Sequence, residues 1–107
     1  MAEDILIAFT TFPGVEIAQK AAREIVDLKL AACANILPEV RSTYRWEGKL
    51  ESSAEVLVLF KLTAARYPEF EKKLRSIHPY EVPEIISCKI DNGLPEYLRW
   101  VVESCAS

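Results

Sequence analysis

The chain has 107 residues, of which 50% are hydrophobic and 27% charged, and its formal net charge is −3. This balance is typical of a soluble globular protein and not of a disordered segment, so we expect one domain over residues 1–107. The acidic balance argues against a nucleic-acid partner, which needs a basic surface, and no segment approaches the roughly 20 apolar residues of a membrane span.

The first residues carry acidic side chains and lack the basic region of a signal peptide, which predicts a cytoplasmic location. The three cysteines form no Cys-x-x-Cys pair, so we expect neither a disulfide framework nor a structural zinc site. Cys33 and Cys88 lie in apolar runs and are expected to be buried. Cys105 lies close to the C-terminus and is expected to be exposed or frayed.

The first elements are read from their apolar patterns. Residues 5–9, ILIAF, are continuously apolar, which predicts a central strand buried on both faces. Residues 15–28 follow Pro13-Gly14 and predict an amphipathic helix, because apolar side chains recur at helical spacing at Ile17, Ala21, Ile25 and Leu28. The small side chains of residues 30–36 predict a strand, which Pro38 interrupts.

A long hairpin follows. Residues 40–46 alternate strictly, Glu47-Gly48 provides a turn that accepts positive φ, and residues 54–62 return as an apolar strand. The strands of this hairpin are longer than the typical strand of about 5–6 residues, and the first of them carries Tyr44 and Trp46. Because a long unpaired hairpin with an exposed Trp favours aggregation, we expect it to pair between subunits of a homo-oligomer.

The second half of the chain again predicts a helix followed by a strand. A helix is expected from Thr63, with Pro68 in its first turn, to about Ile77, since Pro79 disfavours helix just before it. Residues 85–90 predict another strand, and Pro95 opens a last helix. The order βαββαβ plus a C-terminal helix predicts an α+β, ferredoxin-like sandwich.

The segment 77–85, IHPYEVPEI, holds the only histidine, His78. Two interpretations are open: a metal ligand, or a hydrogen-bonded histidine that ends the helix, with its imidazolium near the negative helix end. Glu81 and Glu84 are candidate oxygen ligands. Glu84 directly precedes an apolar strand and should have a partner, for which Lys61 is the natural candidate because buried ammonium groups are rarely unpaired.

Aromatic side chains accompany this predicted pair. Tyr44, Trp46 and Tyr80 offer apolar walls with polar handles, and in an oligomer they can meet Lys61 and Glu84 in a cleft between subunits. Such a cleft either holds a small anion or metabolite or is a well-satisfied interface.

Five segments resemble the CutA family, the divalent-cation tolerance proteins: KLAACANI at 29–36, STYRWEGKLE at 42–51, VLVLFKLT at 56–63, IHPYEVPEI at 77–85 and YLRW at 97–100. The likeness covers essentially the whole chain in order. It implies a ferredoxin-like protomer, assembled as a homotrimer through its hairpins. It also implies a role in tolerance of copper and other divalent metal ions.

The resemblance also bears on the metal ligands. The copper ligands proposed for the family resemble a Cys at the end of the first strand and a His-His pair, and these positions are Phe9, Ile77 and His78 here. Only His78 matches. Copper(II) favours imidazole and thiolate, so we expect a weak site with His78 and with Glu81 or Glu84 as oxygen ligands.

Enzymatic function is not expected, because the sequence has no Gly-rich phosphate loop, no nucleophile elbow and no HExxH motif. Three hypotheses therefore stand side by side. The first is a metal-binding tolerance protein. The second is a trimeric small-ligand sensor similar in build to the PII signal proteins, and the third is an interaction scaffold.

Overall fold

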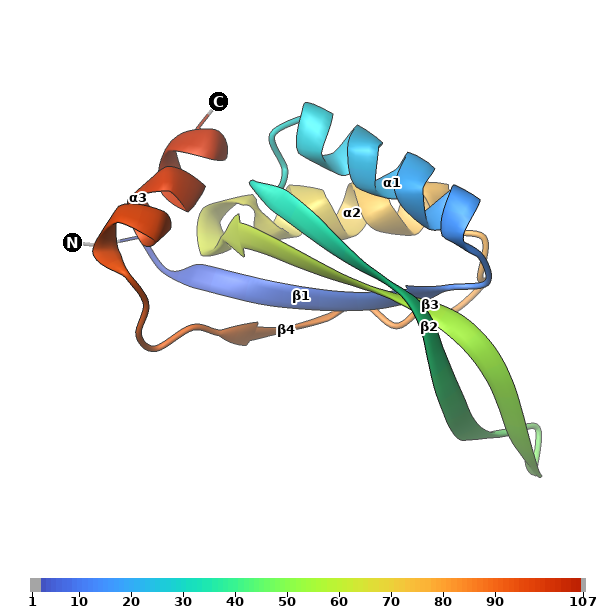
Figure 1. The fold of residues 1–107 in the computed structure, drawn as a ribbon. Helices are drawn as coiled ribbons and strands as arrows, with labels where there is room; N and C mark the ends of the chain where they lie inside the picture. The colour runs from blue at the N-terminus through green and yellow to red at the C-terminus, as the bar shows by residue number, and fades with distance from the viewer. Residues whose placement is uncertain (1–2, 107) are drawn as a thin grey trace.

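The computed structural model describes residues 3–106, so residues 1–2 and 107 of the expected 1–107 domain lie outside the described part. The element order, shown in Figure 1, is β1 (Ile5–Phe12), α1 (Val15–Asp27), β2 (Cys33–Trp46), β3 (Lys49–Thr63), a 3-10 turn (Ala64–Arg66), α2 (Tyr67–Ile77), β4 (Ile86–Lys89) and α3 (Pro95–Ser104). This order confirms the prediction. Within residues 3–106, no helix is long and apolar enough to cross a membrane.

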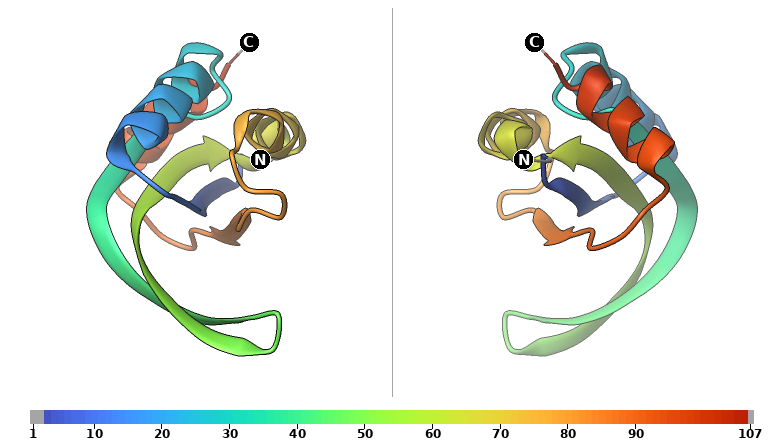
Figure 2. Two further views of the ribbon diagram at one scale, coloured as in Figure 1. Left: turned by 90° about the vertical axis from the view of Figure 1, so that its right-hand side faces the viewer. Right: turned by 90° about the vertical axis from the view of Figure 1, so that its left-hand side faces the viewer.

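The sheet has the order β2-β3-β1-β4, and each neighbouring pair is antiparallel. This is the strand order of a ferredoxin-like fold, and the predicted fold class is confirmed. Helices α1 and α2 cover one face of the sheet, as Figures 1 and 2 show. On the opposite face, α3 contacts β1 and β3 at one end of the sheet, and no other layer of the described chain covers the remainder.

The expectation that β1 is buried on both faces is wrong for a single chain. β1 is central in the sheet, and its alternate residues Ala8, Thr10 and Phe12 are buried on the face that the helices cover. Ile5 alternates onto the opposite face and is buried at the start of the strand. Ile7 and Phe9 alternate onto the uncovered face and are half-buried. The continuous apolar run of β1 therefore exceeds what the single chain buries.

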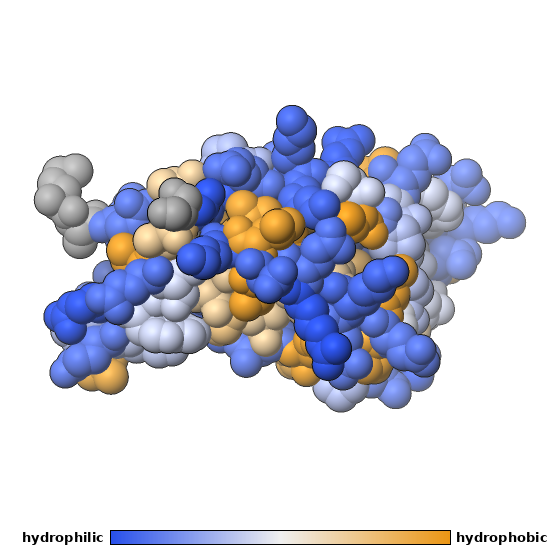
Figure 3. Space-filling view, turned by 90° about the horizontal axis from the view of Figure 1, so that it is seen from above, coloured by the Kyte–Doolittle hydropathy of each residue, from blue (hydrophilic) through white to orange (hydrophobic). Residues whose placement is uncertain are grey.

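The core lies between the sheet and the two helices. Phe60 of β3 packs edge-on against Phe70 of α2, with ring centroids 5.0 Å apart, and both rings are fully buried. On the outer side of the helices, hydrophilic residues cover most of the surface (Figure 3). The apolar stripes of α1 and α2 thus face the sheet, as their helical periodicity predicts.

With the β2–β3 hairpin, the chain extends over 47 × 25 × 22 Å. The structure joins the two predicted segments 30–36 and 40–46 into the single strand β2, with a register shift between Leu37 and Val40 that accommodates Pro38. The predicted turn is confirmed, since Glu47 and Gly48 both have positive φ, 50° and 78°.

Two cysteine predictions are wrong. Cys88 is exposed, because β4 is an edge strand and the side chain lies on the uncovered face opposite Ile7. Cys105 is buried, because the end of α3 packs onto the core and Arg66 donates a hydrogen bond to the Cys105 carbonyl. Cys33 is half-buried.

Helix α1 ends in a Schellman motif that carries an unfavourable residue. The Leu30 N–H donates to the Ile25 carbonyl and the Lys29 N–H donates to the Val26 carbonyl, while Lys29 has a φ of 61°. Because a Cβ is strained in this conformation, we expect Lys29→Gly to stabilise the fold by about 0.5–1 kcal/mol. Lys29→Ala keeps the Cβ and should not stabilise the fold. Guanidinium denaturation at one fixed protein concentration compares the two, and equal midpoints would refute the strain.

Candidate functional site

His78 follows the last residue of α2 and is only 8% exposed. Its Nδ1 accepts a hydrogen bond from the Tyr80 backbone N–H at 3.2 Å. The proton is therefore on Nε2, which donates to Thr10 Oγ1 at 3.0 Å. The ring also stacks on Phe12, with centroids 4.4 Å apart and planes 13° apart. His78 thus ends the helix as a hydrogen-bonded residue and has no free nitrogen lone pair for a metal.

The surroundings of His78 bear on the interpretation of its ring as an imidazolium at the helix end. Burial lowers the pKa of His78 below its ordinary value of 6.5, and the backbone of Thr11 and the charge of Glu55 oppose this shift. The structure therefore favours a neutral imidazole and not an imidazolium interacting with the helix dipole.

A cavity of about 510 Å³ lies between the hairpin and the segment 79–84. We call it the hairpin cavity; its lining residues are Thr11, Tyr44, Trp46, Glu55, Pro79, Tyr80, Glu81, Val82 and Glu84. Of the residues predicted for a cleft, Tyr44, Trp46, Tyr80 and Glu84 meet here within one chain. Lys61 is not among the lining residues.

The hairpin cavity is acidic. Glu55, Glu81 and Glu84 line it, and none of its nine described lining residues is lysine or arginine. The Tyr80 hydroxyl donates to Glu55 Oε2 at 2.7 Å. Burial and, after it, this hydrogen bond and the Glu55 charge raise the pKa of Tyr80 far above its ordinary value, so the phenol stays protonated. The cavity therefore presents carboxylates and aromatic rings to a ligand.

Glu55 is a site residue that sequence reasoning missed. It lies in β3 one residue before the buried Val56, and it faces the side of the sheet that also carries Leu57 and Lys61. The available signal was the alternation of residues 54–62, which places a carboxylate on the same face as Lys61 at the start of an otherwise apolar strand.

The predicted Lys61–Glu84 pair does not form within the chain. Lys61 Nζ instead donates to Asn35 Oδ1 on the neighbouring strand β2. The ion pairs among residues 3–106 are Arg66–Glu69, Lys73–Glu24 and Lys89–Asp4. The strand register explains the separation, because Lys61 lies opposite Ile7 whereas β4, which follows Glu84, begins opposite Phe9. Glu84 is exposed and needs no buried partner.

The predicted metal ligands are not assembled as one site. Among residues 3–106, no group of three or more His, Cys, Asp or Glu side chains is placed to hold a metal ion. Glu81 and Glu84 are exposed at the hairpin cavity, while both nitrogens of His78 are engaged elsewhere. Phe9 is half-buried on the uncovered sheet face, and Ile77 is half-buried against the core.

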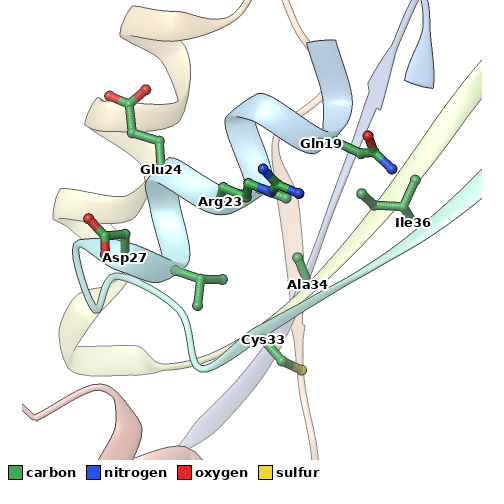
Figure 4. A pocket seen from close by; sticks show the side chains of 9 residues that line it. Gln19, Arg23, Glu24, Asp27, Cys33, Ala34 and Ile36 are labelled. Atoms are coloured by element: carbon green, nitrogen blue, oxygen red, sulfur yellow. The ribbon is translucent and has the colours of Figure 1, made fainter. Parts of the chain in front are cut away.

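A second cavity, of about 790 Å³, lies between α1 and the edge strand β2 (Figure 4). Its polar side chains have mixed charge, since Arg23, Glu24 and Asp27 all line it, and Glu24 is paired with Lys73 at 2.8 Å. The Cys33 thiol points away from α1 and lies 3.7 Å from the Tyr97 hydroxyl. The side chains of this cavity do not converge on one ligand chemistry as those of the hairpin cavity do.

Residues 6–104 match the family model described as the CutA1 divalent ion tolerance protein. The divalent-cation tolerance protein CutA of Thermus thermophilus is 40% identical over 104 residues, which cover 97% of this chain and 98% of that protein. Protein CutA of Mus musculus is 43% identical over 94 residues, covering 88% of this chain but 53% of the mouse protein. The chain thus spans about half the length of that mammalian relative.

Solved structures agree with these sequence matches. The divalent cation tolerance protein of Thermus thermophilus has a TM-score of 0.92 at 37% identity, with 95% of this chain and 99% of that chain covered. A structure described as the periplasmic divalent cation tolerance protein CutA of Archaeoglobus fulgidus has a TM-score of 0.92 at 31% identity, again with 95% and 99% covered.

Proposed function

This chain belongs to the CutA1 divalent ion tolerance family, and we propose that it acts in metal tolerance as a homotrimer that binds divalent cations weakly. The observation that carries the proposal is that Glu55, Glu81 and Glu84 all line one cavity in a chain of this family. We further propose that residues 1–107 work as one domain, in the cytoplasm and without catalysis.

The uncovered sheet face supports assembly. Apolar residues of β1 and β3 alternate onto it, and both edge strands, β2 and β4, have one side without a strand partner among residues 3–106. On the hairpin, Trp46 is 57% and Leu50 is 72% exposed. Apolar surface and strand edges of this kind are normally covered by a partner, and a second and third copy of the hairpin supply one.

The carboxylates support metal binding of a particular kind. Oxygen ligands suit hard divalent cations, and copper(II) binds them less tightly than it binds imidazole and thiolate. His78 could join only by giving up its hydrogen bond to Thr10 or to the Tyr80 backbone. Glu55 is engaged by the Tyr80 hydroxyl and the three carboxylates do not form one ligand cluster. We therefore propose Glu81 and Glu84 as weak ligands for copper or another divalent ion, with Glu55 adding negative charge to the cavity.

Calorimetric titration at neutral pH with manganese(II) and, separately, copper(II) tests this proposal. We expect the double variant Glu81→Gln/Glu84→Gln to bind roughly tenfold more weakly, because the ligand charge is removed. His78→Gln serves as the matched control and should bind like the wild type. Loss of binding in His78→Gln together with full binding in the double variant would assign the metal to His78 instead.

A small-ligand sensor is the second candidate function, and the volume and aromatic lining of the hairpin cavity favour it. A ligand that binds the native protein raises its melting temperature, whereas a scaffold shows no such shift.

A further inference from the structure

We propose that the hairpin cavity binds a small organic ammonium cation, one that carries alkyl groups on its nitrogen. This inference shares the carboxylates of the proposed metal site but rests on a different feature, the aromatic walls.

The aromatic side chains enter the cavity from two sides. Tyr44 and Trp46 are alternate residues of β2 and therefore project from one face of the hairpin, and Tyr80 belongs to the opposing segment 79–84. The face of each ring carries negative potential and attracts a cation, most strongly for Trp. Three such rings around one cavity form a binding surface for a positive charge with apolar substituents.

The remaining lining residues fit the same ligand. Glu55, Glu81 and Glu84 add negative charge, and Val82 and Pro79 add apolar surface. A hydrated metal ion has no apolar surface to place against rings and a valine, whereas an alkylated ammonium ion has both the charge and the alkyl groups. The anion suggested for this cleft by Lys61 is disfavoured, because Lys61 does not line the cavity.

The cavity is also suitably sized and partly organised. Its volume of about 510 Å³ falls within the range of small-molecule sites, roughly 300–1,000 Å³. The hydrogen bond from Tyr80 to Glu55 ties the loop segment to β3, which fixes one ring and one carboxylate relative to each other before any ligand binds.

The test is a titration of the assembled full chain with tetramethylammonium chloride, followed by the NMR signals of the two indole N–H groups. The two tryptophans are Trp46, in the cavity, and Trp100, in α3. We expect a saturable shift of the Trp46 signal with the Trp100 signal unchanged. Potassium chloride at the same ionic strength and tert-butanol, a neutral molecule of similar shape, should produce no saturable shift.

Variants separate this site from the metal site. Tyr44→Leu should weaken tetramethylammonium binding by about tenfold, as the loss of one cation–π wall predicts, while manganese(II) binding stays unchanged. The double variant Glu81→Gln/Glu84→Gln should weaken the binding of both tetramethylammonium and manganese(II). Because Trp46 is also expected to support assembly, Tyr44→Leu is the primary variant, with its trimeric state checked by light scattering. An equal response to potassium, or full binding by a trimeric Tyr44→Leu protein, would overturn the proposal.

Discussion

We expect His78→Ala to lower the free energy of unfolding by about 3 kcal/mol, because the change leaves a cavity and removes partners from buried polar groups. The lost contacts are the stacking on Phe12, the hydrogen bond to Thr10 Oγ1 and the hydrogen bond from the Tyr80 N–H. Guanidinium denaturation at pH 7.5 and fixed protein concentration measures the effect. An effect below about 1 kcal/mol would mean that the ring is not buried and hydrogen-bonded as described.

The same residue predicts a dependence of stability on pH. The pKa of His78 is lowered in the folded chain, so between 6.5 and the lower folded value the unfolded chain binds a proton that the folded chain does not. The contribution of neutral His78 is therefore complete above about pH 6.5 and is lost as the pH falls toward the folded pKa. His78→Gln removes this titration, so its stability should fall less between pH 7.5 and pH 5.5 than that of the wild type. Identical slopes would contradict the assignment.

The second large effect concerns assembly. Light scattering at micromolar concentration should give three times the 12.1 kDa mass of the chain. Trp46→Ala should weaken the trimer by about 2 kcal/mol or more, because a Trp at an interface is a typical anchor residue.

Arg45→Ala is the matched control for this experiment. Arg45 is the neighbouring residue and projects from the opposite face of β2, so its loss should leave the mass unchanged. A wild-type monomer would contradict the assembly, and equal effects of the two variants would show that Trp46 is no anchor.

Relations between residues close in the sequence were predictable from it. The helical period of residues 15–28, the alternation of residues 40–46 and the Glu47-Gly48 turn are local patterns, and the structure confirms the elements that they predict. Periodicity reports which side of an element is apolar, so the order of elements and the ferredoxin-like class also followed. The sequence also showed that β1 is apolar on both faces, although it did not show that a single chain leaves much of one face uncovered.

Only the tertiary structure decided the chemistry of the site. Thr10, the partner of the His78 ring, is 68 residues away in the chain, and no local pattern couples the two. The partner of Lys61 depended on strand register, which gave Asn35 instead of Glu84. Cys88 is exposed because β4 is an edge strand, and Cys105 is buried because the end of α3 packs onto the core. Neither position can be read from the local sequence. The sequence determined what each segment is, whereas packing between distant segments determined which side chains are free to bind.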